Sequence, residues 1–406
     1  MPPQRKAWLV MLAAYLAGIA VALNQFKVPP MMQVLIEQLK MDVTIGGWLM
    51  SSFAVAGVIL GIPAVFVLRK LGAKGAGLLA LGCTIIGSAT GALANDPAML
   101  LLGRTIEGIG LGLISVVAPA IISMWFPPHA RGTPMGIWAS WAPVGSFLMF
   151  NLAGPLHGAF GWRGIWWFGA LLALIAFVLY ALVVSAPKVA ETERDLPHES
   201  SAQSRKVLLT PASWILALAF GTFTFTALAY STWAPSYLGQ AFGLDAQAAS
   251  FNVSLVMLAV IPSTLIAGRI LDRVKNRYLV LTAAMLVVGI FSIWSFRLGS
   301  ADVIVPYMLA LGFASGFVPT AVFTLAPETM PGPERASLAL GIVSVGQNLG
   351  MFFGPPAVAA VIASGNWEAA VIPLVAAGFI GLVAAVWLHA RRIRSRSAMS
   401  EAPQLP

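Results

Sequence analysis

Long runs of apolar residues recur along the chain from Ala7 to Leu388, separated by short polar loops. The runs show no period-two alternation, which favours helices over the strands of a barrel. A helix needs about 20 mostly apolar residues to cross a bilayer, where the backbone must satisfy its own hydrogen bonds. The pattern predicts an all-α membrane protein with twelve transmembrane helices, near residues 7–37, 43–68, 73–94, 98–125, 132–158, 163–186, 212–238, 247–270, 278–297, 303–326, 337–363 and 367–390.

The predicted helices form two sets of six, and the second set repeats features of the first. Shifting the sequence against itself superimposes several residues in equivalent helices: Pro30 on Pro235, Asp42 on Asp245, Gly108 on Gly312, Gly112 on Gly316, Gly136 on Gly341, Gly145 on Gly350 and Trp162 on Trp367. Duplicated halves of this kind are typical of transporters. We therefore expect six-helix bundles at residues 1–186 and 211–392, a cytoplasmic linker at 187–210 and a cytoplasmic tail at 393–406.

The basic residues lie mainly on one side of the predicted membrane. Only 10% of residues are charged, and the net charge is +9. If the N-terminus is inside, 19 of the 24 Lys and Arg residues fall at cytoplasmic ends. This asymmetry is the positive-inside rule, so it predicts a multi-pass protein of the cell (inner) membrane with both termini in the cytoplasm. It also explains the basic charge without a nucleic-acid partner. The first apolar run has features of a signal peptide, but the repeat uses it as a helix, so we interpret it as uncleaved.

Enzymatic and metal-dependent functions find little support in the sequence. The single cysteine, Cys83, excludes an internal disulfide. His129 and His157 are isolated, without the spacing of metal ligands, and there is no nucleotide-binding loop of the Walker type. We predict no cofactor and no metal site. An ATP-driven pump is not expected from this chain alone.

The six-plus-six layout, the long linker and the stretch "GRILDRVKNR" together resemble the major facilitator superfamily over nearly the whole chain. The stretch is similar to that family's cytoplasmic signature Gly-x-x-x-Asp-Arg. The resemblance implies that Gly268 permits close helix approach and that Asp272 and Arg273 form a conformational latch. The equivalent first-half loop, "VFVLRKLGAK", departs from the signature, because Arg69 stands where the family has an acid.

Two further stretches resemble motifs of the same family. "GRTIEGIGLG" is similar to its helix-four pattern Arg-x-x-x-Gly through Arg104 and Gly108. "GPLHG", residues 154–158, is similar to the glycine-proline motif of drug antiporters. Small residues are also common wherever membrane helices cross closely, so a packing role for "GPLHG" remains open.

Three charged residues lie deep inside predicted helices: Lys27, Arg104 and Glu107. Each charge at bilayer depth costs about 2.5 to 3.5 kcal/mol on insertion scales, so such residues are functional candidates. Arg104 and Glu107 are spaced i,i+3 and can pair. Burial favours the protonated form of Glu107, whereas Arg104 favours its carboxylate, so Glu107 is the candidate for proton coupling. A static structural pair is the alternative.

Lys27 follows Asn24 on the same face of helix one and precedes a Pro-Pro break. The three charges sum to +1, or to +2 when Glu107 is protonated, which suits an anion and repels a cation. We therefore take Lys27 and Arg104, with Asn24 and Gln25, as candidate substrate-binding residues. Alternatively, Lys27 reaches the outer membrane interface along its flexible side chain.

The remaining candidates are uncharged side chains that offer stacking surface and hydrogen bonds to a substrate. They are Trp138, Trp141, Tyr230, Gln347 and Asn348. The aromatic members are equally compatible with interfacial or packing roles.

The sequence favours secondary active transport of a small, monocarboxylate-like organic anion, coupled to protons through Glu107. The expected partners are that solute, protons and the lipid bilayer, and we expect a monomer. One rival is a drug:proton antiporter, supported by "GPLHG" and Arg104. Another is a transporter-like receptor that binds without translocating. A membrane enzyme fits least, because helix interiors show no nucleophile-base pair.

Overall fold

The structure is a computed structural model that describes residues 3–60, 63–127, 132–185, 211–330 and 333–400, and these residues form helices without any strand. The linker predicted at 187–210 lies outside the described residues. The first half contains α1 (Pro3–Gln25), α2 (Val28–Gln38), α3 (Val43–Leu60), α4 (Pro63–Ala92), α5 (Pro97–Trp125), α6 (Gly132–Ala139) and α7 (Trp141–Val183). The second half contains α9 (Pro211–Phe242), α10 (Ala246–Arg273), α11 (Arg277–Ser292), α12 (Ile304–Ser315), α13 (Phe317–Leu325), the short η3 (Ala326–Thr329), α14 (Pro333–Ile362) and α15 (Val371–Ser400).

These helices provide twelve membrane spans. Ten helical stretches of the described chain are long and apolar enough to cross a membrane. One of them, Thr133–Val183, contains two spans, because Gly161 adopts a φ of 66° that breaks α7. The shorter apolar helix Arg277–Ser292 supplies the twelfth span. Gly72, with a φ of 68°, similarly divides α4 between the second and third spans. The predicted all-α, twelve-helix fold is confirmed.

Some helix ends differ from the sequence-based expectation. The last helix continues to Ser400 instead of ending near residue 390, so the predicted tail begins inside α15. The ninth span ends at Ser292 rather than near residue 297. Alanine and arginine are strong helix formers, and they fill "HARRIRSRSAMS" beyond the apolar run, so helix propensity extends α15 past the hydrophobic signal.

Aspartates start three of the helices. The Asp96 side chain accepts a hydrogen bond from the Met99 N–H at 2.9 Å, and the Asp245 side chain accepts one from the Ala248 N–H at 2.7 Å. Asp42 accepts from the Thr44 N–H at 2.7 Å in the turn before α3. These contacts satisfy N–H groups that the helix itself leaves unpaired.

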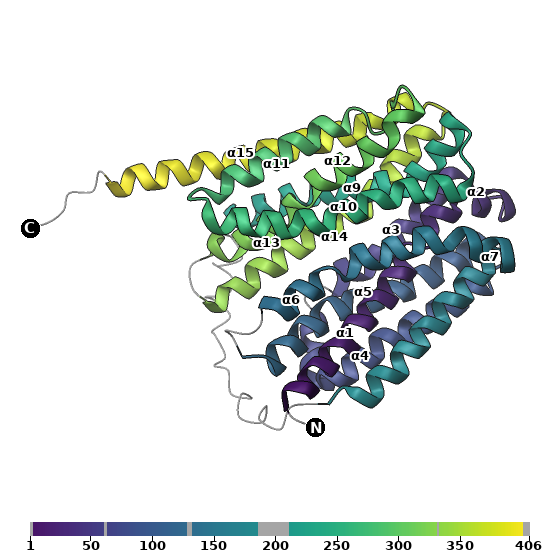
Figure 1. Cartoon of the computed structure of the whole chain (residues 1–406), viewed down its shortest axis with the longest axis horizontal. Helices are drawn as coiled ribbons and strands as arrows, with labels where there is room; N and C mark the ends of the chain where they lie inside the picture. The colour runs from purple at the N-terminus through teal and green to yellow at the C-terminus, as the bar shows by residue number, and fades with distance from the viewer. Residues whose placement is uncertain (1–2, 61–62, 128–131, 186–210, 331–332, 401–406) are drawn as a thin grey trace, which may run out of the picture.

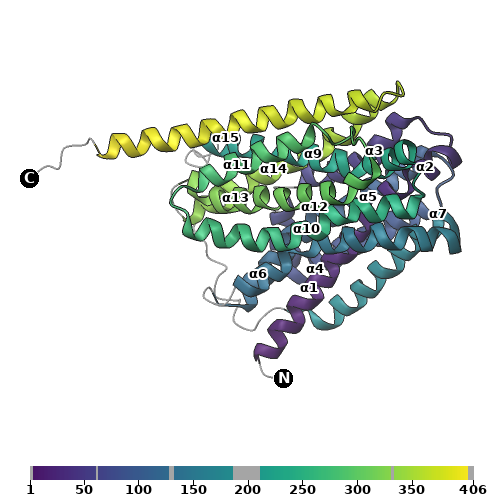
Figure 2. The ribbon, with the colours of Figure 1, turned by 45° about the horizontal axis from the view of Figure 1, so that its top comes forward.

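The two halves lie side by side as bundles, the first coloured purple to teal and the second green to yellow in Figures 1 and 2. Their internal packing repeats. A Cβ on Gly108 would lie 2.9 Å from the carbonyl carbon of Phe53, and a Cβ on Gly312 would lie 2.9 Å from that of Val256. In each half, therefore, a glycine in the fourth span lets it touch the backbone of the second. The pseudo-symmetry expected from the sequence is present.

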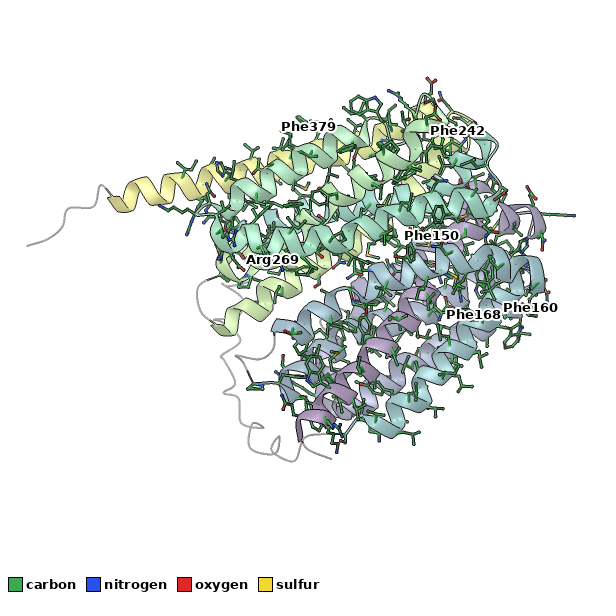
Figure 3. The ribbon with its side chains drawn as sticks, viewed as in Figure 1. Phe150, Phe160, Phe168, Phe242, Arg269 and Phe379 are labelled. Atoms are coloured by element: carbon green, nitrogen blue, oxygen red, sulfur yellow. The ribbon has the colours of Figure 1, made fainter. Side chains whose placement is uncertain are left out.

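The buried apolar side chains of the described residues form three clusters. One cluster is shared by both halves and includes Met32 and Leu35 of α2 with Trp233 and Leu238 of α9. The second cluster belongs to the first half and the third to the second half. The shared cluster joins the halves at the end of the molecule that carries α2. The large exposed side chains are also apolar, as expected for a surface in contact with lipid; examples are Phe160 and Phe379, which point outward in Figure 3.

Candidate functional site

A break in the first span positions Lys27. Pro29 and Pro30 have no backbone N–H, so the carbonyl groups one turn earlier lose their usual helical donors. The helix accordingly stops at Gln25 and restarts at Val28 as α2. Lys27 lies in the gap and is fully buried, so it does not reach the protein surface.

Arg104 of α5 supplies donors to the broken helix. Its Nη2 donates to the carbonyl oxygen of Gln25 at 2.9 Å, and its Nη1 donates to that of Asn24 at 2.6 Å. Its Nε donates to the carbonyl oxygen of Leu49 on α3 at 3.1 Å. The guanidinium also lies 4.3 Å from the centre of the Phe53 ring. Arg104 thus connects α1, α3 and α5 through main-chain carbonyls, and Gln25 contributes its carbonyl to this contact.

Glu107 lies between the two cations. Its Oε1 is 2.5 Å from Lys27 Nζ, and its Oε2 is 2.6 Å from Arg104 Nη1. All three side chains are 0% exposed. The i,i+3 pair expected from the sequence is present, and Lys27 joins it to form what we call the charge triad. The triad carries a net charge of +1 when Glu107 is ionised.

Lys27 completes its coordination with side chains only. Its Nζ donates to Asn24 Oδ1 at 2.9 Å and to Ser88 Oγ of α4 at 2.8 Å. It also lies 4.8 Å from the centre of the Trp166 ring of α7. Ser88 is fixed in turn, because its Oγ donates to the Trp166 carbonyl oxygen at 2.7 Å. Asn24 therefore contacts the triad as predicted.

Sequence reasoning missed Ser88 and Trp166. The only local signal for Ser88 is a hydroxyl within the apolar run "TIIGSATGA". Such serines commonly bond to their own helix, so this signal does not identify a lysine partner. Trp166 is one of 13 tryptophan residues, and no local pattern in the sequence identifies it as the one that contacts Lys27.

The other predicted first-half residues lie apart from the triad. Trp138 and Trp141 stack on each other, with ring centres 5.2 Å apart and planes 16° apart. Trp138 belongs to the buried cluster of the first half and packs against Gly18, and the partly buried Trp141 packs against the same cluster. This pair contributes to packing in this conformation.

Gln347 and Asn348 lie on α14 and are half-buried. The Gln347 carbonyl oxygen accepts a hydrogen bond from Thr224 at 2.9 Å, and the Asn348 amide donates to the carbonyl oxygen of Ser344 at 2.9 Å. A Cβ on Gly57 of α3 would collide with the Asn348 side chain. Asn348 therefore contacts the first half, whereas the main chain of its neighbour Gln347 is hydrogen-bonded to α9.

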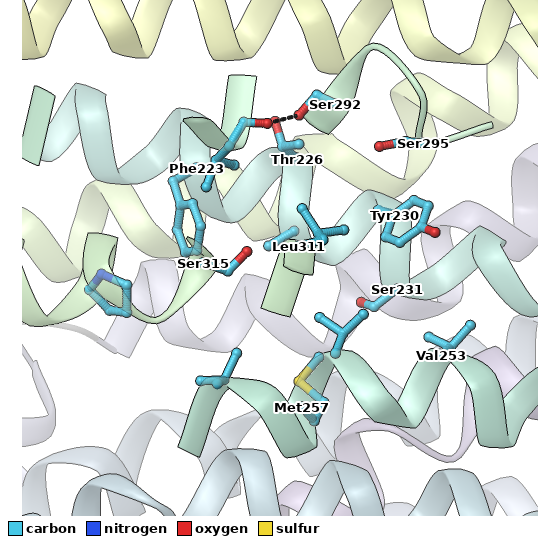
Figure 4. Close-up of a pocket in the computed structure, with 15 residues that line it drawn as sticks. Phe223, Thr226, Tyr230, Ser231, Val253, Met257, Ser292, Ser295, Leu311 and Ser315 are labelled. Carbon is cyan, nitrogen blue, oxygen red and sulfur yellow. Dashed lines mark hydrogen bonds between the residues drawn. The ribbon is translucent and has the colours of Figure 1, made fainter. Parts of the chain in front are cut away.

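Tyr230 lines a cavity inside the second half, shown in Figure 4. The cavity has a volume of about 180 Å³ and lies between α9, α10, α11, α12 and α13. Most of its wall is apolar, with hydroxyl groups from Thr226, Ser231, Ser292 and Ser315. All of its lining residues belong to the second half. The structure therefore does not bring Tyr230 to the charge triad, contrary to the single cavity expected from the sequence.

The expected latch is absent from this conformation of the described chain. Asp272 and Arg273 are exposed and form no ion pair with the described residues. No described atom lies within 4 Å of a Cβ built on Gly268, so no helix crosses closely there. The roles of Gly268, Asp272 and Arg273 as a latch stay a prediction for another conformation. Instead, Arg277 Nη1 pairs with Glu328 Oε1 at 2.6 Å at the same end of the bundle.

Comparisons with known proteins agree with this architecture. The sequence model of the Major Facilitator Superfamily matches residues 14–338. The hexuronate transporter of Bacillus subtilis is 26% identical over 62% of this chain and 60% of its own length. The 2-nitroimidazole transporter of Escherichia coli is 27% identical over 79% of each chain. The matched part of this chain spans 60% of the length of the hexuronate transporter, and 31% and 51% of the lengths of two other curated relatives.

A solved structure shares the fold. The crystal structure of a bacterial homologue of the human lysosomal transporter Spinster, in an inward-facing and unoccupied conformation, aligns with a TM-score of 0.75. The alignment covers 95% of this chain and 98% of that one at 18% sequence identity. At that identity the likeness concerns the fold alone.

Proposed function

This chain belongs to the major facilitator superfamily. From that premise we propose that it transports a small organic anion across the membrane by alternating between two conformations, and that transport is coupled to protons through Glu107. The single observation that supports this most strongly is the charge triad. Lys27, Arg104 and Glu107 are the fully buried charged side chains of the described residues, and they carry an excess positive charge. A buried excess charge is costly, and an anionic ligand would neutralise it.

The contacts of the two cations suggest different roles. Arg104 is held by three main-chain carbonyls besides Glu107, so releasing it would disrupt α1 and α3. Lys27 is held only by side chains, so releasing it would break no hydrogen bond to a main-chain carbonyl. Lys27 is therefore the better candidate for the cation that contacts the substrate. This revises the expectation from the sequence, in which both cations bind the anion directly.

In the proposed cycle, Glu107 neutralises Lys27 through their direct contact before the substrate binds. Protonation of Glu107 removes that partner and leaves two cations in a medium of low dielectric constant, which increases the attraction for an anion. Proton binding and anion binding thus support each other. Because Lys27 is fully buried here, the cycle also requires the helix break at residues 26–27 to open toward the substrate pathway.

The arrangement of the halves supports alternating access. They share buried contacts at the end that carries α2, whereas the other buried clusters belong to one half each. Rocking of one half against the other would exchange which end is closed. From the positive-inside distribution of basic residues, we place both termini in the cytoplasm.

The relatives support an anionic substrate without identifying it. The hexuronate transporter is named for a sugar acid, a carboxylate. A second candidate function is the export of uncharged or amphipathic compounds. It is favoured by the mostly apolar cavity beside Tyr230 and by the relative named a 2-nitroimidazole transporter.

Uptake by proteoliposomes tests the proposal. Purified protein should accumulate at least one member of a panel of small carboxylates when an inward proton gradient is imposed, and a protonophore should abolish the accumulation. Lys27→Ala should lose this uptake, whereas Lys70→Ala, which removes an exposed cation at a helix end, should retain it. Transport of amphipathic compounds without carboxylate uptake would favour the second candidate. Normal uptake by Lys27→Ala would refute the role of Lys27.

A further inference from the structure

A polar pocket lies at one end of the second half, at the level where its spans end. It has a volume of about 220 Å³, and its lining is formed by Val274, Lys275, Asn276, Arg277, Tyr278, Glu328 and Arg392. These residues lie at the end of α10, the start of α11, in η3 and near the end of the twelfth span. The ends of membrane spans lie at the level of lipid headgroups. We call this feature the basic pocket.

The charge of the basic pocket is positive. Among the described residues, Lys275, Arg277 and Arg392 line it together with one carboxylate, Glu328. Arg277 Nη1 pairs with Glu328 Oε1 at 2.6 Å, and Arg277 Nε donates to the carbonyl oxygen of Leu271 at 3.0 Å. These two contacts fix the guanidinium of Arg277, and the ion pair neutralises the carboxylate of Glu328. The described lining residues carry more positive than negative charge.

The start of α11 adds partial positive charge to the wall. A helix leaves its first N–H groups without intrahelical acceptors and concentrates positive charge at that end. The Asn276 side chain occupies the N-cap position but makes no capping hydrogen bond. Its Nδ2 lies 3.3 Å from His389 Nδ1, while its Oδ1 is buried and without a hydrogen-bond partner in the described structure. The start of α11 therefore adds to the positive field of the pocket.

The surroundings favour a lipid as the source of the anion. Leu279, in the first turn of α11, is 52% exposed, and Ile393, next to Arg392 on α15, is 49% exposed. Such apolar side chains beside a basic pocket suit the acyl chains of a phospholipid whose headgroup fills the pocket. Basic pockets at the ends of membrane helices are known to bind anionic headgroups.

We propose that the basic pocket binds the phosphate diester of an anionic phospholipid such as phosphatidylglycerol. The phosphate faces Lys275, Arg277 and Arg392. This site is separate from the charge triad and does not depend on the transported solute.

Lipid binding by the full-length protein tests the assignment. The protein is placed in nanodiscs of phosphatidylcholine alone or of equal parts phosphatidylcholine and phosphatidylglycerol, and its melting temperature is measured. Phosphatidylglycerol should raise the melting temperature. In detergent, titration with phosphatidylglycerol gives the affinity. Arg392→Gln and Lys275→Gln should each weaken that affinity about fivefold, since a basic residue near a membrane surface contributes about 1 kcal/mol to the attraction.

Control variants and soluble ligands separate this site from general charge effects. Arg69→Gln removes an exposed cation from a helix end in the first half and should leave the affinity unchanged. Equal losses in Arg69→Gln and Arg392→Gln, or no loss in either pocket variant, would overturn the proposal. Inorganic phosphate and glycerol phosphate are titrated in detergent as well. If they stabilise the protein as strongly as phosphatidylglycerol, the pocket takes a soluble phosphate and the lipid assignment is wrong.

Discussion

Replacing Glu107 with Gln removes a buried charge and keeps the shape of the side chain. Glu107 accepts from Lys27 Nζ at 2.5 Å and from Arg104 Nη1 at 2.6 Å. A glutamine has one acceptor oxygen and an NH₂ group that only donates, so it can accept from one of these cations and not from both. The variant mimics protonated Glu107 and fixes the site in that state.

The structure limits the cost of this change. Removing one partner of a buried ion pair typically costs about 3 to 5 kcal/mol. Here Lys27 keeps Asn24 Oδ1 and Ser88 Oγ as acceptors, and Arg104 keeps its main-chain carbonyls. Hydrogen bonds to charged groups contribute about 1.5 to 3 kcal/mol each. We therefore expect a loss near the lower limit, about 3 kcal/mol, and a protein that still folds with a lowered melting temperature.

Three measurements on one preparation give the readout: substrate exchange, proton-driven accumulation and the pH dependence of binding. If Glu107 carries the coupled proton, Glu107→Gln should retain exchange, because both conformations remain accessible with a neutral side chain. It should lose accumulation and most of the pH dependence, since binding and protonation are reciprocally linked. Glu37→Gln makes the same chemical change at an exposed carboxylate of α2 and should behave like the unaltered protein.

Retained proton-driven accumulation in Glu107→Gln would refute the coupling role. A parallel decline of exchange and accumulation would indicate that the triad is a structural element. A lower melting temperature does not distinguish the two roles, because Glu107→Gln removes the same ion pairs in either case. The comparison between exchange and accumulation separates them.

Three further predictions concern the triad, helix packing and topology. Ser88→Ala removes one of the acceptors of Lys27 and should lower stability by about 1.5 to 3 kcal/mol, measured by thermal unfolding; an unchanged melting temperature would contradict the contact. Gly108→Ala should lower the free energy of unfolding by about 1 to 3 kcal/mol, because the added methyl group overpacks against α3. Gly136→Ala, where the structure leaves open space, should have little effect. Similar melting temperatures for the two variants would argue against the close crossing at Gly108. A cysteine introduced near Ser201, outside the described residues, should be labelled only from the cytoplasm and one near Asn366 only from outside; the reverse pattern would overturn the predicted orientation.

The sequence by itself determined the fold class of this protein. The hydrophobic runs are local properties, and each run long enough to span a bilayer must form a helix to satisfy its backbone. The repeat also predicted two equivalent halves, in which Gly108 and Gly312 occupy matching positions. Charges at bilayer depth are rare, so Lys27, Arg104 and Glu107 were identifiable as candidates, and the spacing of Arg104 and Glu107 predicted their pairing.

Only the tertiary structure decided which partners these residues have. Lys27 and Glu107 are separated by 80 positions, and Ser88 and Trp166 by 78, so their contacts depend on how α1, α4, α5 and α7 pack. No local pattern encodes that packing. The structure likewise separated Tyr230 from the triad and assigned Arg104 to main-chain carbonyls, because a broken helix exposes acceptors that only a neighbouring helix can reach. Helix formation depends on residues close in sequence, whereas the chemistry of a buried site depends on side chains that meet only after the helices have assembled.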